Sequence, residues 1–222
     1  MTATRSPATD DVSSRPLRKD AARNRALLVA AAREVFASRG LDATLDDVAR
    51  HANVGVGTAY RHFANKYELA GAILDQVLDE VVTDAQSCLE CDDPWTGLVR
   101  FLEGVLVRQS ADRGLREVLT GAKDSARMIE VQARMAVPVG SLLERARATG
   151  AIRPDVTITD LGIVLTMLCT VADLGAEARP DLWRRYLPTL LAGLRPGGPE
   201  FAVEPLTEAE FAAEAAALHG HS

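Results

Sequence analysis

Residues 44–66 read TLDDVARHANVGVGTAYRHFANK, the most informative stretch of the chain. Thr44 and Asp47 have the spacing of a capping box, with Asp in place of the usual Glu or Gln, which predicts a helix N-terminus. Two glycines, Gly55 and Gly57, then suit a sharp turn and a close backbone approach. Between these two signals, apolar residues recur at the spacing of one helix face: Leu45, Val48, Ala49 and Ala52.

A second short helix is predicted over residues 58–63, and Lys66 follows just beyond it. Two short helices joined by a tight turn, the second rich in polar and aromatic side chains, are typical of a helix-turn-helix. In that motif the second helix enters the major groove of DNA. The pattern leaves one alternative open, a helical hairpin that packs a core and contacts nothing else.

The same stretch resembles the DNA-binding signature of TetR-type (tetracycline-repressor-like) transcriptional regulators. The resemblance extends over roughly residues 18–69, and the rest of the chain resembles the family only in its helical layout. It is carried by an ordered set of positions: Arg39, Gly40, Thr44, Val48, Ala49, Ala52, Val54, Gly57, Tyr60, His62, Phe63, Lys66 and Leu69. The resemblance implies an all-α fold with an N-terminal three-helix DNA-binding domain on a larger helical domain that binds a ligand and dimerises.

Candidate DNA contacts combine this resemblance with side-chain chemistry. Tyr60 and Lys66 resemble the phosphate contacts of the family, which fix register without reading sequence. Arg61 is the candidate for bidentate guanine recognition, and neutralising a phosphate is its alternative role. The full set of expected DNA contacts is Thr44, Gly55, Val56, Gly57, Thr58, Tyr60, Arg61, His62 and Lys66.

The charge of the chain is divided unevenly. The net charge is −6, yet residues 1–66 hold 11 Lys and Arg against 7 Asp and Glu, whereas residues 67–222 hold 14 against 24. A basic N-terminal part on an acidic body is expected where phosphate binding is confined to one end. Chance clustering on a solvated surface is the alternative.

Composition and helix signals predict the domain organisation. Aromatic residues make up only 5% of the chain, and no hairpin signal is found, so helices are favoured over sheets. We expect a disordered arm (1–17), the DNA-binding domain (18–65), an effector-binding and dimerisation domain (66–195), and a loop with a short C-terminal helix (196–222). Helices outside the 44–66 stretch are expected over residues 20–38, 66–87, 94–112, 115–119, 124–149, 161–176, 181–194 and from 207 onwards.

The helix over residues 161–176 is apolar on nearly every side and must therefore be buried on every side. Pairing residues 161–194 with a second copy would make a four-helix interface, so a homodimer is expected. A wholly internal core is the alternative.

Family members resemble one another in holding a ligand chamber within the helical body. Here that resemblance implies an unknown small-molecule effector that is apolar or mixed in character. The candidate lining residues are Trp95, Phe101, Met128, Met135 and Met167, and ordinary core packing is the alternative for each.

Targeting signals are not found. Residues 1–17 lack the apolar core of a signal peptide, and the longest apolar run, residues 161–172, is shorter than the roughly 20 residues that span a bilayer. We therefore expect a cytoplasmic protein with no membrane partner.

Cys88 and Cys91 form a C-x-x-C pair. A zinc site needs four ligands and no second pair follows, nor is there a βαβ context for a thioredoxin-like site. We interpret the two as small residues at a helix end, with a redox or metal role as the alternative. No metal and no cofactor are predicted.

Two other functions are compatible with an all-helical chain. An all-α enzyme or ligand carrier is disfavoured because no catalytic or phosphate-loop motif is found. A protein-interaction module explains residues 161–194 but leaves Gly57, Tyr60 and Lys66 without a purpose. The sequence therefore favours a dimeric, sequence-specific DNA-binding regulator, a repressor released from a pseudo-palindromic operator by a small molecule, and not an enzyme.

Overall fold

The computed structural model describes residues 14–111 and 125–219, and all regular structure in those two ranges is helical. The predicted all-α fold is therefore confirmed, while the short helix expected over residues 115–119 lies outside the described residues. The elements are α1 (Ser14–Arg39), the 3-10 turn η1 (Gly40–Asp42), α2 (Leu45–His51), α3 (Val56–His62), α4 (Lys66–Leu89), α5 (Pro94–Ala111), α7 (Ser125–Ala148), α8 (Ile158–Gly175), α9 (Trp183–Gly193) and α10 (Glu208–His219).

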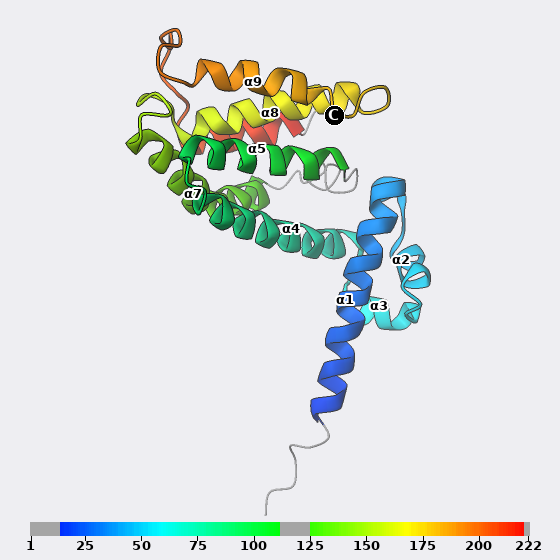
Figure 1. Ribbon diagram of the computed structural model, residues 1–222. Coiled ribbons are helices and arrows are strands. Elements are labelled where there is room, and N and C mark those ends of the chain that lie inside the picture. The colour runs from blue at the N-terminus through cyan, green and yellow to red at the C-terminus, as the bar shows by residue number, and fades with distance from the viewer. Residues whose placement is uncertain (1–13, 112–124, 220–222) are drawn as a thin grey trace, which may run out of the picture.

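The first three helices form a small unit, here called the reading head (α1–α3), which stands at one end of the molecule (Figure 1). Helix α1 ends at Gly40, whose φ of +61° lies in the left-handed region that favours glycine. The head has its own buried apolar side chains, contributed by all three helices: Leu28, Ala32, Phe36, Val48, Ala49, Ala59 and Phe63.

Helix α1 begins earlier than expected. We predicted a start at Asp20 after a disordered arm, but α1 already includes residues 14–17. The physical reason lies in Pro16, because proline in the first turn of a helix loses no hydrogen bond and has a suitable φ. Sequence reasoning gave too much weight to the polar composition of the segment.

The helix N-terminus predicted at Thr44 is confirmed by its hydrogen bonds, and two further helices begin at side-chain caps. Thr44 and Thr157 each cap a helix in a reciprocal capping box, with Asp47 and Asp160 as their partners. The side chain of Asn65 accepts hydrogen bonds from two backbone N–H groups at the start of α4. Local chemistry therefore fixes where α2, α4 and α8 begin.

The remaining helices form the body (α4–α10), drawn in Figure 1 as roughly parallel layers. Helix α4 packs against both α5 and α7, α5 packs on α8, and α8 packs on α9. Helix α10 packs against α7, and the ring of Phe211 lies directly over Gly162 of α8, where any Cβ would be only 2.5 Å from the ring. The C-terminal helix is thus part of the body.

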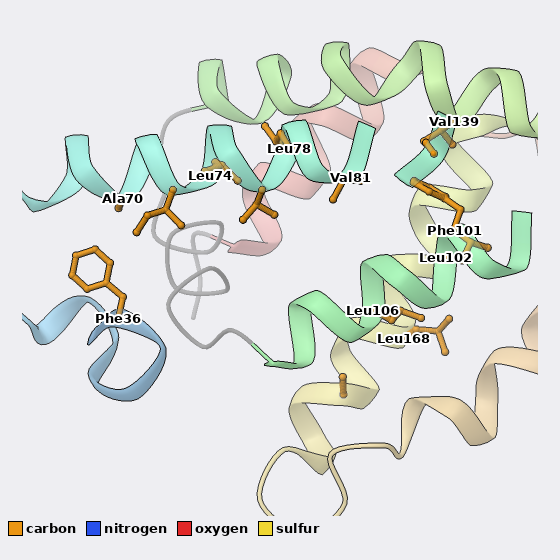
Figure 2. Packing of buried hydrophobic residues seen from close by; sticks show 14 of the residues in the cluster. Phe36, Ala70, Leu74, Leu78, Val81, Phe101, Leu102, Leu106, Val139 and Leu168 are labelled. Atoms are coloured by element: carbon orange, nitrogen blue, oxygen red, sulfur yellow. The ribbon is translucent and has the colours of Figure 1, made fainter. Parts of the chain in front are cut away.

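Helix α4 joins the head to the body. Phe36 of α1 points toward Ala70 of α4, and both are buried (Figure 2). Arg33 of α1 forms an ion pair of 2.8 Å with Glu80 of α4. Apolar packing and charge therefore both connect α1 to the helix that runs into the body.

Helix α8 has two different long sides. Leu161, Val164 and Leu168 are buried, whereas Met167 is 42% and Leu174 83% exposed. The 18 residues of α8 are long and apolar enough to cross a membrane by length and composition, a test that core helices of soluble proteins also pass. Our expectation from the shorter run at 161–172 missed this because the folded helix is longer than that run.

Candidate nucleic-acid interface

Helix α3 presents one face to the head and the other to solvent. Ala59 and, at the end of the helix, Phe63 are fully buried against α1 and α2. Gly57, Tyr60 and Arg61 are exposed. Because these positions follow the helical period, the packing of Ala59 and Phe63 against the head directs Tyr60 and Arg61 outward.

The turn between α2 and α3 is built differently from our expectation. Its left-handed residue is Asn53, with φ of 52°, whereas Gly55 is the extended N-cap of α3 and Gly57 lies within the helix. Asn tolerates the left-handed region better than most side chains, so glycine was not required there. A Cβ on Gly57 would meet no atom within 4 Å. Gly57 therefore leaves open space at the N-terminus of α3.

Thr44 and Val56 stand at the N-terminal ends of the two short helices. The hydroxyl of Thr44 donates to Asp47 at 2.6 Å and accepts from the Asp47 N–H at 3.2 Å. The Thr44 hydroxyl and then the Thr44 backbone N–H, which donates to the same carboxylate oxygen at 3.0 Å, lower the pKa of Asp47 from 3.8 to about 2. Asp47 therefore remains ionised, while Thr44 and the 38% exposed Val56 lie at the surface.

Tyr60 is half exposed and linked to α2. Hydrogen bonding to the Asp46 carboxylate, with the charge of Asp46 adding to it, raises the pKa of the Tyr60 phenol. The phenol is thus held as a neutral O–H donor at the surface. A neutral donor beside an exposed helix face is suited to a phosphate oxygen.

Arg61 is folded back on its own helix. Its Nε donates to the carbonyl of Gly57 at 3.2 Å, and its Nη2 donates to the hydroxyl of Thr58 at 2.9 Å. Both partners are exposed or half-buried, so the side chain lies along the outer surface of α3. The structure thus brings Arg61 and Thr58 together, and contact with a base requires the guanidinium to leave these partners.

Lys66 lies at the start of α4 and contacts the head. Its ammonium donates to the carbonyl of Leu41 in η1 and lies 5.5 Å from the ring centroid of Tyr67. Tyr67 itself is 65% exposed, and sequence reasoning did not single it out. The sequence signal that could have identified Tyr67 is its place directly after Lys66, the predicted phosphate contact. A tyrosine side chain carries a polar tip that is suited to phosphate.

Two further basic groups border α3. His62 is half-buried at the end of the helix. The guanidinium of Arg25 in α1 lies 5.1 Å from the centroid of the buried Phe63 ring, which fixes a positive charge beside α3. The head thus carries basic side chains from α1, α3 and α4.

A cavity of about 290 Å³ lies between α1 and α2, away from the predicted ligand residues. It is bordered by Asp47 and by the contact between Nε2 of His51 and Oε2 of Glu34, which are 2.7 Å apart. Arg39 and Arg50 also line it and both contact Asp47. These contacts tie the cavity to the cap of α2, so we assign it a structural role.

Comparison of this chain with known protein families and solved structures identifies its family. Residues 28–73 match the family described as bacterial regulatory proteins, tetR family, and residues 93–196 match the C-terminal domain described as transcriptional regulator SbtR-like. The solved TetR transcription regulatory protein from Mycobacterium vanbaalenii is 31% identical over 81% of this chain and 99% of its own, with a TM-score of 0.61. The chain belongs to the TetR family.

Two further relatives indicate how far the likeness extends. TtgW, an uncharacterised HTH-type transcriptional regulator of Pseudomonas putida, is 40% identical over 90 residues, which cover 40% of this chain and 61% of TtgW. The solved FadR of Bacillus subtilis, in complex with stearoyl-CoA, shares the fold with a TM-score of 0.63 at 15% identity, over 77% of this chain and 97% of its own. The TetR family is a family of bacterial transcriptional regulators that bind DNA and form dimers.

The residues predicted to line a TetR-type ligand chamber lie in different surroundings. Phe101 of α5 is buried, near Val139 of α7 (Figure 2). Met135 is half-buried against the core, and Trp95 is half-buried under the guanidinium of Arg195 at 4.7 Å. Met167 is exposed on α8, and the side chain of Met128 lies outside the described residues. The structure therefore brings Phe101 and Met135 into the core but places Met167 on the outside.

Proposed function

We propose that this protein is a dimeric, sequence-specific DNA-binding repressor that a small molecule releases from its operator in the cytoplasm. In this proposal residues 18–65 bind DNA and residues 66–195 bind the effector and form the dimer. The observation that carries it is the outward face of α3, where Tyr60, Arg61 and the open space at Gly57 stand together on a rigid, capped scaffold. We propose double-stranded DNA as the partner of that face.

The proposed contacts have distinct roles. The open N-terminus of α3 at Gly55 and Gly57 lets backbone N–H groups approach a phosphate. The phenol O–H of Tyr60 donates a hydrogen bond to a second phosphate. Arg61 gives up its hydrogen bonds within the helix and instead donates two hydrogen bonds to N7 and O6 of a guanine. These contacts replace internal hydrogen bonds of solvent-exposed groups, which keeps the cost of the rearrangement small.

Lys66 and its neighbours continue the contact beyond α3. The ammonium group of Lys66 turns from the Leu41 carbonyl to the DNA backbone, and His62 and Tyr67 border the same surface. Thr44 and Thr58 place hydroxyl groups on the flanks of α3. We infer that this ring of donors fixes the register of α3 on the duplex.

The dimer uses the exposed side of α8 together with α9. Leu174 and Tyr186 are 83% and 43% exposed in the single chain, and Met167 lies on the same side of α8 as Leu174. Apolar surface of this kind is suited to a self-complementary two-fold interface. A two-fold dimer presents two copies of α3 to successive major grooves, roughly 34–36 Å apart, and so reads a pseudo-palindrome.

The effector chamber is proposed within the body, beside Phe101 and Met135. The FadR neighbour, which shares the fold, was solved in complex with stearoyl-CoA, and this supports a small-molecule effector for the present chain. The exposure of Met167 is better explained by the dimer surface than by a chamber. Trp95 and Met128 remain candidates for the chamber wall.

Alanine substitution tests the DNA-binding proposal. Tyr60→Ala and Lys66→Ala each remove one phosphate contact, so affinity for duplex DNA falls for all sequences, and Lys66→Ala lowers the slope of affinity against salt by about 1. Arg100→Ala is the matched control, because it removes one exposed charge from the body. Circular dichroism and sedimentation establish that fold and dimer are intact. Unchanged DNA affinity in both head variants would overturn the proposal.

A further inference from the structure

Cys88 and Cys91 lie on the two sides of the C-terminus of α4. Cys88 is in the last turn of the helix, and Cys91 lies just after it in irregular structure. The N–H of Cys91 donates to the carbonyl of Cys88 at 3.3 Å, so the two residues stand one helical turn apart. Such a pair has Cβ atoms about 5–6 Å apart, and a disulfide needs about 3.5–4.5 Å. Disulfide formation therefore requires Cys91, which lies outside the helix, to move toward Cys88.

The two sulfur atoms have different surroundings. Cys91 is half-buried, and Nη1 of Arg100 donates to its Sγ at 3.4 Å. Arg100 therefore lies directly against the more accessible of the two sulfur atoms. Cys88 is only 8% exposed, and burial, with the neighbouring Cys91 adding to it, raises the pKa of its thiol. Cys91 is therefore suited to meet an oxidant first, and Cys88 is suited to follow.

We propose that Cys91 and Cys88 form a dithiol that hydroperoxides oxidise to an intramolecular disulfide. The Cys91 thiolate attacks one peroxide oxygen; an S–O bond forms, the O–O bond breaks, and the other oxygen leaves and is protonated. The Cys88 sulfur then attacks the Cys91 sulfenic acid; the S–S bond forms, the S–O bond breaks, and the hydroxide takes the Cys88 proton and leaves as water. Two electrons pass from the two thiols to the peroxide.

The site lies where three helices meet. A Cβ on Gly97 of α5 would be only 2.5 Å from the carbonyl oxygen of Cys88 and 3.4 Å from the Cβ of Cys91. Arg145 of α7 donates to the carbonyl of Leu89, the last residue of α4. Both α5 and α7 therefore contact the short segment that the disulfide would tighten. This inference does not depend on DNA binding.

A metal role is less well supported. A stable zinc site takes four ligands, and within residues 14–111 and 125–219 no group of three or more His, Cys, Asp or Glu side chains is placed to hold a metal ion. Two thiols of unequal exposure with one cationic neighbour are better suited to disulfide chemistry.

Oxidation of the full chain tests the proposal. Reduced protein is treated with hydrogen peroxide, remaining thiols are alkylated, and the tryptic peptide over residues 67–100, which holds both Cys88 and Cys91, is analysed by mass spectrometry. We expect this peptide to lose the mass of two hydrogen atoms and to resist alkylation until a reductant is added. Cys169, whose thiol donates to Gln109 in α5, is the internal control and should remain alkylated.

Variants separate the roles of the two thiols. Cys88→Ser should leave a sulfenic acid on Cys91 that dimedone traps, Cys91→Ser should leave Cys88 reduced, and Arg100→Ala should slow disulfide formation. Cys169→Ser is the matched control and should leave the rate unchanged. Oxidation of Cys169 as fast as Cys91, or of Cys88 at an undiminished rate in Cys91→Ser, would overturn the proposal.

Discussion

The reading head and the body are both helical, but they expose side chains of opposite chemical character. Residues 1–66 carry a net charge of +4 and the head exposes Tyr60 and Arg61, whereas residues 67–222 carry −10 and the body exposes Leu174. Polar, cationic groups on a rigid surface are suited to phosphates and bases, and apolar groups are suited to a second copy of the same chain. Exposure alone therefore does not identify the partner of a surface, because the partner depends on the chemistry of the exposed side chains.

The two regions are nevertheless connected by one helix, α4, which contacts both of them. Packing of Phe36 near Ala70 and the ion pair between Arg33 and Glu80 connect the head to it. In the body, Arg108 of α5 pairs with Asp84 of α4, and Arg134 of α7 pairs with Asp79 at 2.6 Å. Acidic groups along α4 thus receive cations from three other helices.

The largest expected effect is the loss of stability when the apolar packing between the head and the body is removed. Phe36→Ala leaves a cavity beside α4 and should lower the free energy of unfolding by about 3–5 kcal/mol. Leu27→Ala on the same helix is the matched control, because Leu27 is 42% exposed and should cost about 0.5 kcal/mol or less. Urea denaturation followed by circular dichroism measures both. Equal losses in the two variants would contradict this description of the junction.

The next effect concerns the apolar surface of the body. Leu174→Glu places one like charge from each copy in the proposed interface and should cost several kcal/mol of dimer stability. Sedimentation should then find folded monomers, and operator affinity should fall with the loss of the second head. Val203→Glu changes a residue of similar exposure, 81%, in the loop before α10 and should leave the dimer intact. A dimer that withstands Leu174→Glu would place the interface elsewhere.

A smaller effect concerns base recognition in the head. Arg61→Ala should lower operator affinity by about 1–3 kcal/mol and relax the preference at one base position. Its stability should change little, since Arg61 bonds only to exposed or half-buried groups of its own helix. Competition binding with single-base operator variants measures this, with Arg100→Ala as the control. A uniform loss across all operator variants would assign Arg61 to a phosphate instead.

The smallest effect is a pH dependence in the cap of α2. The pKa of Asp47 is about 2 in the folded state against 3.8 for the free group, so ionised Asp47 stabilises the fold. This stabilisation is fully present above about pH 4 and is lost as pH falls toward about 2. Asp47→Asn should therefore be less stable than the wild type at neutral pH, and the difference should shrink in acid. A difference that is constant with pH would contradict the assignment.

Local signals predicted the scaffold well. The capping boxes at Thr44 and Thr157 and the cap at Asn65 involve residues two or three positions apart, so sequence spacing alone fixes their geometry. The buried side chains Leu28, Ala32 and Phe36 of α1 lie four residues apart, a helical period that is also visible in the sequence. The turn before α3 was less predictable, because Asn53 and a glycine both accept the left-handed backbone there.

Side-chain arrangements were not predictable in the same way. The contact of Lys66 with Leu41 joins residues 25 positions apart, and the folded-back Arg61 is one of several rotamers that the sequence allows. Met167 was expected in a ligand chamber, but a helix that is apolar on nearly every side does not indicate which side faces the core. That choice is made by packing against α5 and α9.

The central claim is that two copies of the reading head recognise one DNA sequence. The most direct measurement incubates purified protein with a pool of random-sequence duplexes, recovers the bound fraction at moderate salt and sequences it. We expect an enriched inverted repeat whose half-sites lie about one helical turn apart. No enriched sequence, with binding that disappears as salt rises, would show phosphate attraction alone and would contradict the claim.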